Sequence, residues 1–253
     1  MIEIEQNGNV ALLRMVHGKA NAMDLAFCEG LIAALKRVQA EPTVAAIVLT
    51  GRGKIFSAGV DLPRLLEEDE QYTRAFVKQL SRMFEAVFFH PKPIVAAING
   101  HAIAGGCILA CATDYRIMVY EGSKIGIPEL FVGVPFPTTA LEIMRFVLAQ
   151  KDFQHLIYHG QISPPQKAFS IGLLEEMKPH AEVEACALKH AAHMGSVPAS
   201  VFSLTKEQIR WDVRQRISEG EARFGEKIVA EWLKEERRSA MRDFISRTFK
   251  RDR

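Results

Sequence analysis

The sequence has few of the features that mark a secreted, membrane-bound or nucleic-acid-binding chain. It contains only four cysteines, none with CxxC spacing, so a reducing compartment is a simpler expectation than a disulfide framework. No apolar run is long enough to cross a membrane. With 32 Lys and Arg against 30 Asp and Glu, the net charge of +2 gives no general reason to expect nucleic acid as a partner.

The N-terminal stretch MIEIEQNGNVALLRM is unlike a secretion signal, because it contains acids and alternates as a strand does. We therefore expect a cytoplasmic enzyme or binding protein that does not enter a membrane. No Gly/Ser-rich linker or low-complexity tract divides the 253 residues, and 48% of them are hydrophobic, which is enough for a full core.

The common motifs of nucleotide, zinc and serine chemistry are also missing. The glycines of TGRGKIFSAG fit neither G-x-G-x-x-G nor a P-loop, and no G-x-S-x-G is present. Two histidine pairs, His155 with His159 and His190 with His193, could each share a helix face, but neither has the acid of an HExxH site. Surface or packing roles are the simpler interpretation, and we expect no metal site. Cys107 and Cys111 lie four apart in an apolar segment that is typical of buried thiols.

Short apolar runs alternate with helix-period segments over the first 138 residues, which predicts an α/β fold. Beyond that point the strand signal fades, and the charged run from 198 to 250 is predicted to be helical. Its apolar residues recur at helical spacing, so these helices should pack on the body, on another subunit, or on both.

Two glycine-bearing turns follow apolar strand-like runs, FSAGVDL at 56–62 and IAGGCILA at 103–110. One interpretation is a pair of tight turns that pack nothing. The alternative is that both turns direct backbone N–H groups toward one pocket. Two such donors would hold a thioester oxygen as it becomes an enolate, because fixed dipoles need no reorganisation when the charge appears.

A third segment, IGIPELFVGVPFP at 125–137, contains a single acid, Glu129, among apolar residues and prolines. An exposed loop acid is the simplest interpretation of Glu129 alone. Its isolated position in an apolar run indicates instead a desolvated carboxyl whose raised pKa suits a general base.

Taken together, four segments identify the chain as similar to the crotonase, or enoyl-CoA hydratase/isomerase, superfamily. They are GKANAMD, TGRGKIFSAGVDL, PKPIVAAINGHAIAGGCILACATDYRI and GIPEL, in the family's order and spacing. The resemblance implies a spiral of strand-strand-helix units over residues 1–195 and a helical region over 196–253 for oligomerisation and closure of the site. It also implies an acyl-CoA thioester substrate, no cofactor beyond the coenzyme A of that substrate, and a homotrimer or a hexamer made of two trimers.

The resemblance also assigns roles to individual residues. The oxyanion N–H groups belong to Val60 and Gly105, with Glu129 as acid and base. Ala58 and its neighbour Gly59 fall where the family meets the adenine end of coenzyme A, and Lys19 falls where the family meets its phosphates.

At the C-terminus, Phe249 and Lys250 resemble a pair that contacts coenzyme A across a subunit boundary. That pair completes the coenzyme A contacts that the resemblance implies for this chain.

One departure separates this chain from the hydratases of the family, which use two glutamates. The first glutamate position is occupied by Ile108, and only the second acid, Glu129, is kept. Hydration needs two positioned acids, whereas moving a double bond from C3 to C2 needs one carboxylate. We therefore predict a 3-enoyl-CoA to 2-enoyl-CoA isomerase, with Ile108 as a pocket wall.

Several alternatives to this isomerase stay open. The first is an enoyl-CoA hydratase whose second acid enters from another loop, with Glu67, Glu68 and Asp69 as the first candidates. The others are thioester hydrolysis, decarboxylation, and a non-catalytic protein that binds acyl-CoA or RNA.

Overall fold

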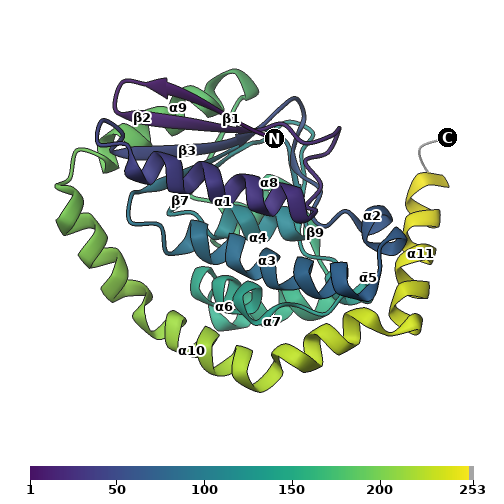
Figure 1. Ribbon diagram of the computed structural model, residues 1–253. Coiled ribbons are helices and arrows are strands. Elements are labelled where there is room, and N and C mark those ends of the chain that lie inside the picture. Colours follow the sequence, from purple (N-terminus) through teal and green to yellow (C-terminus); the bar gives the residue numbers. More distant parts are fainter. Residues whose placement is uncertain (251–253) are drawn as a thin grey trace.

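Two β-sheets and the helices around them make up the body of the molecule, and two long helices complete it (Figure 1). The computed structural model describes residues 1–250, and of residues 248–250 it describes the backbone alone. In the larger sheet the order is β1-β2-β3-β5-β7-β10; β1 runs antiparallel to β2 and the other neighbours are parallel. Its strands are β1 (Ile2–Asn7), β2 (Val10–Met15), β3 (Ala46–Gly51), β5 (Ile94–Ile98), β7 (Tyr115–Val119) and β10 (Glu176–Lys178).

The smaller sheet has the order β4-β6-β8-β9, with β4, β6 and β8 parallel and β9 antiparallel. Its strands are β4 (Ile55–Ser57), β6 (His101–Ile103), β8 (Ile125–Gly126) and β9 (Ile162–Ser163). The chain visits the two sheets alternately, since β3, β5 and β7 lie in the larger sheet and β4, β6 and β8 directly follow them in the smaller one. This is the expected spiral of strand-strand-helix units.

Helices follow each pair of strands. Those of the body are α1 (Leu25–Ala40), α2 (Leu62–Glu67), α3 (Glu70–Phe88), α4 (Gly105–Cys111), α5 (Glu129–Val132), α6 (Thr138–Val147), α7 (Gln150–His159), α8 (Pro165–Ser170) and α9 (His180–Met194). The C-terminal region consists of α10 (Ala199–Leu233), which runs along the outside of the body in Figure 1, and α11 (Glu235–Lys250).

The central strands of the larger sheet are buried on both faces, as is usual where helices cover a parallel sheet. Alternate side chains of β2 point in opposite directions: Leu13 joins the main core with α1 and α3, whereas Leu12 joins a second cluster under α9. Every residue of β3 is buried for the same reason. This burial on both faces explains why VALLRM and AIVLTG are almost continuously apolar instead of alternating between apolar and polar residues.

Buried ion pairs and apolar contacts hold α10 on the body. Asp114, which follows α4, accepts from the two buried cations of α10: Lys206 Nζ lies 2.7 Å from one carboxylate oxygen and Arg210 Nη2 lies 2.9 Å from the other. Burial lowers the pKa of Lys206 to about 8. Further along the helix, Ile217 and Trp232 are buried against the main core, whereas Trp211 stays exposed.

The sequence-based predictions hold for the fold class and for the helical C-terminal region, and they miss two strands. We expected no strand after residue 138, yet β9 and β10 lie there. Both strands have only two or three residues, which is too short to produce a visible alternation of apolar and polar residues. Among the residues described, no helix combines the length and apolar character that spanning a membrane requires.

Candidate active site

Three turns meet at one edge of the smaller sheet because they follow neighbouring parallel strands. The order β4-β6-β8 places the carboxyl ends of these strands side by side, and the carboxyl ends of parallel strands are where α/β folds usually bind ligands. Val60 follows β4, Gly105 follows β6, and Glu129 follows β8. Topology therefore brings together three residues that are far apart in the sequence.

The first turn is held by a short bridge to the segment before α1. Met23 N–H donates to the Gly59 carbonyl at 2.8 Å, and Asp61 N–H donates to the Met23 carbonyl at 2.9 Å. The bridge thus involves the Gly59 carbonyl and the Asp61 N–H, and the Val60 N–H takes no part in it. Within residues 1–250 that N–H has no hydrogen-bond acceptor, so it is available to a ligand.

The second turn reverses the backbone directly before α4. Ala104 has a φ of 55°, a region that non-glycine residues rarely adopt, and its N–H is fixed to the Gly126 carbonyl at 2.8 Å. Gly105 is the first residue of α4, where an N–H has no partner within the helix. No other acceptor for it occurs in the described part of the chain. Two unpaired N–H groups, at Val60 and Gly105, thus flank the same site.

The two turns touch so closely that side chains cannot fit between them. A Cβ added to Gly59, whose φ is 86°, would lie 2.7 Å from Ala104 Cβ and 3.0 Å from Gly105 N. One added to Gly106 would lie 2.2 Å from the Ser57 carbonyl oxygen. The glycines therefore have a structural role, and that role sets the spacing of the two N–H groups.

Glu129 lies inside the site, whereas the two apolar residues that directly follow it lie outside. In the single turn of α5, Glu129 and Val132 are buried while Leu130 and Phe131 are exposed, which inverts the usual arrangement. The turn ends at Gly133, with a φ of 82°, and Val134 N–H donates to the Glu129 carbonyl at 2.9 Å. Oε2 of Glu129 has no hydrogen-bond partner among the described residues. Burial raises the pKa of Glu129 to about 8, which suits a proton shuttle near neutral pH.

Two cavities open on either side of Glu129. The outer one, of about 80 Å³, is bounded by Ala58, Val60, Ala104, Glu129 and other residues that include Phe244 of α11. The inner one, of about 20 Å³, is lined by residues of the body and α10: Val60, Leu80, Phe84, Gly105, Ile108, Glu129, Val134, Pro135, Phe136, Pro137 and Trp232. Glu129 is the only ionisable side chain among the described residues that line these two cavities.

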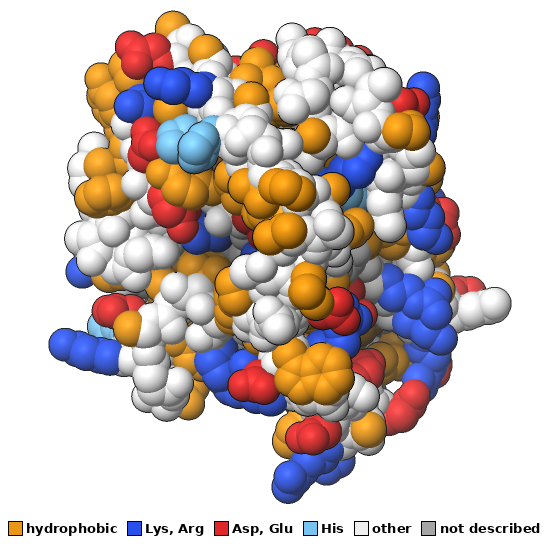
Figure 2. All heavy atoms as spheres, turned by 90° about the vertical axis from the view of Figure 1, so that its left-hand side faces the viewer, with side chains coloured by type: hydrophobic (Ala, Val, Ile, Leu, Met, Phe, Trp, Pro, Cys, Tyr) orange, Lys and Arg blue, Asp and Glu red, His pale blue; other side chains and the backbone are white. Residues whose placement is uncertain are grey.

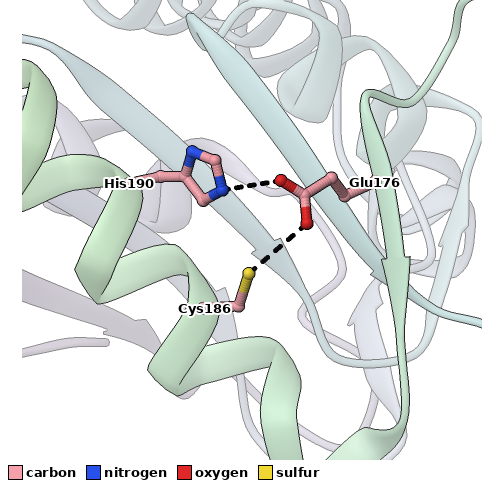
Figure 3. A group of neighbouring side chains, drawn as sticks. All are labelled: Glu176, Cys186 and His190. Carbon is pink, nitrogen blue, oxygen red and sulfur yellow. Dashed lines mark hydrogen bonds and ion pairs between the residues drawn. The ribbon is translucent and has the colours of Figure 1, made fainter.

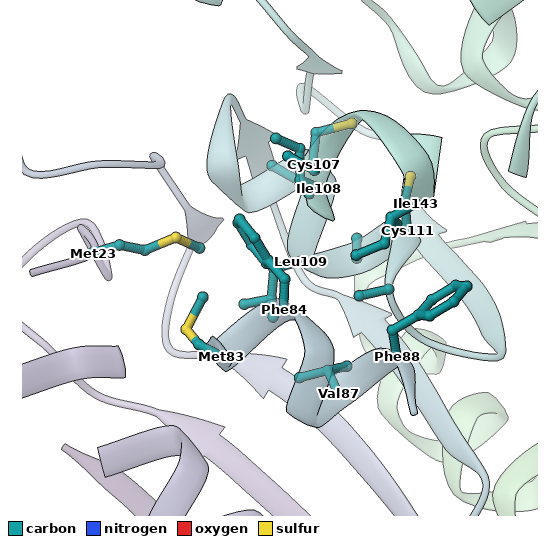
Figure 4. Packing of buried hydrophobic residues seen from close by; sticks show 14 of the residues in the cluster. Met23, Met83, Phe84, Val87, Phe88, Cys107, Ile108, Leu109, Cys111 and Ile143 are labelled. Atoms are coloured by element: carbon teal, nitrogen blue, oxygen red, sulfur yellow. The ribbon is translucent and has the colours of Figure 1, made fainter. Parts of the chain in front are cut away.

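Ile108 forms a wall of the inner cavity, as its position one turn after Gly105 predicts. It packs with the neighbouring residues of α4 and with Phe84 of α3 in the core (Figure 4). The loop that might have supplied a second acid does not reach either cavity. Glu67 is exposed, Glu68 pairs with Arg64, and Asp69 caps α3 through the Tyr72 N–H.

Some of the residues expected to contact coenzyme A lie at or near the outer cavity. Ala58 is exposed at its rim, and its N–H donates to the Ala20 carbonyl at 3.0 Å, which places exposed Lys19 beside the same turn. Gly59 is buried under that rim. Phe249 and Lys250 lie outside the residues whose side chains are described.

The two histidine pairs are arranged differently. His155 and His159 have ring centroids 4.5 Å apart on α7. His190 contacts Glu176 Oε1 through Nε2 at 2.6 Å, and Cys186 Sγ lies 3.6 Å from Oε2 (Figure 3).

Potential ligand atoms of Glu176, Cys186 and His190 lie within 4.8 Å of one another. Lys178 Nζ already lies 3.3 Å from Oε2 of Glu176, and Tyr115 donates to Oε1 at 3.0 Å. The carboxylate thus has a positive partner and donors on both oxygens, so we interpret the cluster as a polar network that holds α9 against the edge of the larger sheet.

Sequence reasoning missed three residues of the site. Met23 frames the first turn, Trp232 lines the inner cavity, and Phe244 lines the outer one. Met23 lies in the quoted GKANAMD segment, which was a usable signal. Trp232 and Phe244 come from the C-terminal helices, whose helical spacing indicates only that one face is buried.

Known proteins show the same architecture and the same family. The family model for enoyl-CoA hydratase/isomerase matches residues 5–248. A putative enoyl-CoA hydratase of Thermus thermophilus is 33% identical over 82% of both chains, and mitochondrial enoyl-CoA delta isomerase 1 of Rattus norvegicus is 26% identical over 83% of this chain and 73% of its own. The crystal structure of human mitochondrial delta3-delta2-enoyl-CoA isomerase superposes with a TM-score of 0.94 at 22% identity, covering 99% of this chain and 98% of that one.

The chain therefore belongs to the enoyl-CoA hydratase/isomerase family, the crotonase superfamily, and is an enzyme of that family. Relatives described as hydratases and relatives described as isomerases both match it. The choice between the two activities depends on the site itself.

Replacing Glu129 should change how stability depends on pH. Because burial raises its pKa from 4.5 to about 8, the folded protein holds this proton more tightly than the unfolded chain. Stability should therefore fall as pH rises from about 4.5 to 8, by up to about 1.4 kcal/mol per pH unit. Glu129→Gln stays neutral and should become progressively more stable than the wild type over this window.

Urea unfolding of both proteins at several pH values measures this difference. Glu67→Gln, at an exposed position, controls for the loss of one negative charge. Parallel stability curves for the wild type and Glu129→Gln would show that Glu129 is not desolvated.

Proposed function

We propose that this enzyme is an isomerase that moves the double bond of a 3-enoyl-CoA to give the 2-enoyl-CoA. The observation that carries the proposal is the solitary acid: among the described residues, Glu129 is the only ionisable side chain lining the two cavities beside it, and Ile108 occupies the wall where a second acid would act. The chemistry uses no cofactor other than the coenzyme A that the substrate carries.

In this mechanism the thioester oxygen accepts from the N–H groups of Val60 and Gly105. The Glu129 carboxylate removes a proton from C2, and the electron pair moves to the thioester oxygen as a dienolate forms. Two fixed N–H dipoles stabilise that negative charge as it develops. Glu129, now protonated, returns the proton at C4 while the double bond forms between C2 and C3. The acid thus ends the cycle ionised as it began.

Hydration of a 2-enoyl-CoA is the second candidate, because the Thermus thermophilus relative is described as a putative hydratase. Hydration requires one group to take a proton from water and another to deliver one to carbon. Around Glu129 the described cavity walls supply apolar side chains instead of that second group. Ile108, Leu80 and Phe84 would leave a water molecule there without an activating partner.

We also propose that the chain assembles as a homotrimer or a pair of trimers. Large apolar side chains stay exposed along α10, namely Val201, Leu204, Ile209, Trp211 and Phe224. Figure 2 shows that apolar side chains also lie among charged ones on the face at the left of Figure 1. Such exposed apolar surface is typical of subunit contacts. A monomeric mass from light scattering would contradict this assembly.

The products formed from the two candidate substrates test the proposed reaction. The wild type should convert 3-hexenoyl-CoA to 2-hexenoyl-CoA and should form little 3-hydroxyhexanoyl-CoA from 2-hexenoyl-CoA. Glu129→Gln should lower isomerase turnover by roughly two to four decades, the usual span for a general base, while acyl-CoA binding persists. Chromatography with mass detection identifies the products. Faster hydration than isomerisation by the wild type would overturn the proposal.

Ile108→Glu tests whether the apolar wall decides between the two reactions. The new carboxyl would lie in the inner cavity with Glu129, and two neighbouring carboxyls raise each other's proton affinity. One could then stay protonated as acid while the other acts as base. We expect measurable hydratase activity, reduced isomerase activity and lower stability, because a buried isoleucine is replaced by an acid.

Ile108→Gln is the matched control, since it adds a polar group without a second carboxyl. Equal hydration by the two variants would show that the acid at this position is not what hydration lacks.

A further inference from the structure

The two cavities differ in where they can place the parts of an acyl-CoA. Exposed Ala58 lies at the rim of the outer cavity, so the large charged coenzyme A moiety must lie on that side. The inner cavity is lined by Gly105, Glu129 and other residues that are mostly buried. With the thioester oxygen between Val60 and Gly105, the acyl end of the substrate therefore points into the inner cavity.

The inner cavity is small. Its volume is about 20 Å³, and a site needs roughly 10–15 Å³ by this measure to hold one water molecule. It therefore has room for about one or two carbon atoms of an acyl chain. Carbons C1 to C4 take part in the reaction between the oxyanion donors and Glu129. Only the carbons beyond C4 need the space farther in.

Trp232 is a firmly held part of the wall of this cavity. Its side chain is 1% exposed, and its indole Nε1 donates to the Pro135 carbonyl at 3.0 Å. Its ring meets Phe76 of α3 edge-on, with centroids 6.3 Å apart. Moving the indole aside would break a buried hydrogen bond, and Pro135 lies in a segment whose backbone is restrained by a further proline at 137. The facing walls come from Phe84 and Phe136.

We propose that Trp232 is a specificity-determining residue that limits the substrate to acyl chains of about four to six carbons, the length that this cavity can accept. The limit applies to the reaction of the proposed function and rests on it. Trp232 contacts the acyl tail and itself carries no proton in the reaction. Because it belongs to α10, the C-terminal region sets the chain length while the body supplies the chemistry.

A chain-length series tests the proposal directly. For the wild type, kcat/KM should be at least tenfold lower with 3-octenoyl-CoA than with 3-hexenoyl-CoA, since even one methylene in an apolar pocket changes selectivity by about tenfold or more. Trp232→Ala should raise the octenoyl-to-hexenoyl ratio at least tenfold. Trp232→Leu keeps more of the buried volume and should shift the ratio in the same direction by a smaller factor.

Tyr158→Ala is the matched control, because it removes an aromatic ring that is exposed on α7 and lines neither cavity. Its ratio should equal that of the wild type. Equal turnover of 3-octenoyl-CoA and 3-hexenoyl-CoA by the wild type would overturn the proposal. A folded Trp232→Leu or Trp232→Ala protein with an unchanged ratio would overturn it as well.

Binding of saturated acyl-CoAs separates this inference from the proposed function. Calorimetry with butanoyl-, hexanoyl- and decanoyl-CoA should show affinity falling beyond hexanoyl-CoA in the wild type and not in Trp232→Ala. If that pattern appears while no 3-enoyl-CoA is isomerised, the chain-length limit stands and the proposed reaction fails. If every chain length is isomerised and bound equally well, the reaction stands and the limit fails.

Discussion

The contact between two backbone turns is the constraint on which the site depends. Gly59 and Gly106 allow the turn after β4 to lie directly against the start of α4, at distances where any Cβ would collide with backbone. Backbone hydrogen bonds hold each turn. Met23 pairs with the first turn, and the Gly126 carbonyl accepts from the second. One N–H on each turn has no partner among the described residues. A packing requirement thereby produces a pair of donors whose separation cannot relax when a substrate leaves.

The same constraint explains how much of the site the sequence could predict. Residues that the backbone geometry demands carry a strong local signal, so the two glycine turns could be located from FSAGVDL and IAGGCILA, whereas the assignment of Val60 and Gly105 as donors came from the family resemblance. Glu129 could be found because a lone acid among apolar residues conflicts with its surroundings. In the structure, the acid Glu129 is buried in α5 while the apolar Phe131 is exposed, the reverse of what their polarity favours. The roles given to coenzyme A contacts such as Lys19 stay predictions.

The parts that could not be predicted depend on contacts between distant segments. The α/β order and the long C-terminal helices follow from hydrophobic periodicity, whereas β9 and β10 are too short to leave a pattern and form because a sheet edge is there to pair with. Periodicity along α10 shows that one stripe is buried without showing what it touches. Trp232 and Trp211 belong to the same helix, yet Trp232 lines a cavity and Trp211 faces solvent. Only the path of α10 across α3 and α6 distinguishes them.

Burial of Glu129 connects these separate features. An ionised carboxyl without a hydrogen bond on Oε2 is unfavourable in an apolar cavity, and its proton affinity rises as a result. The walls that cause this, Phe84, Ile108, Phe136 and Trp232, also leave little space next to the acid. Enlarging the cavity for a longer acyl chain would admit water beside Glu129, which would lower its pKa and weaken it as a base. Chain length and proton affinity are therefore set by the same side chains, and a change that relaxes one should alter the other.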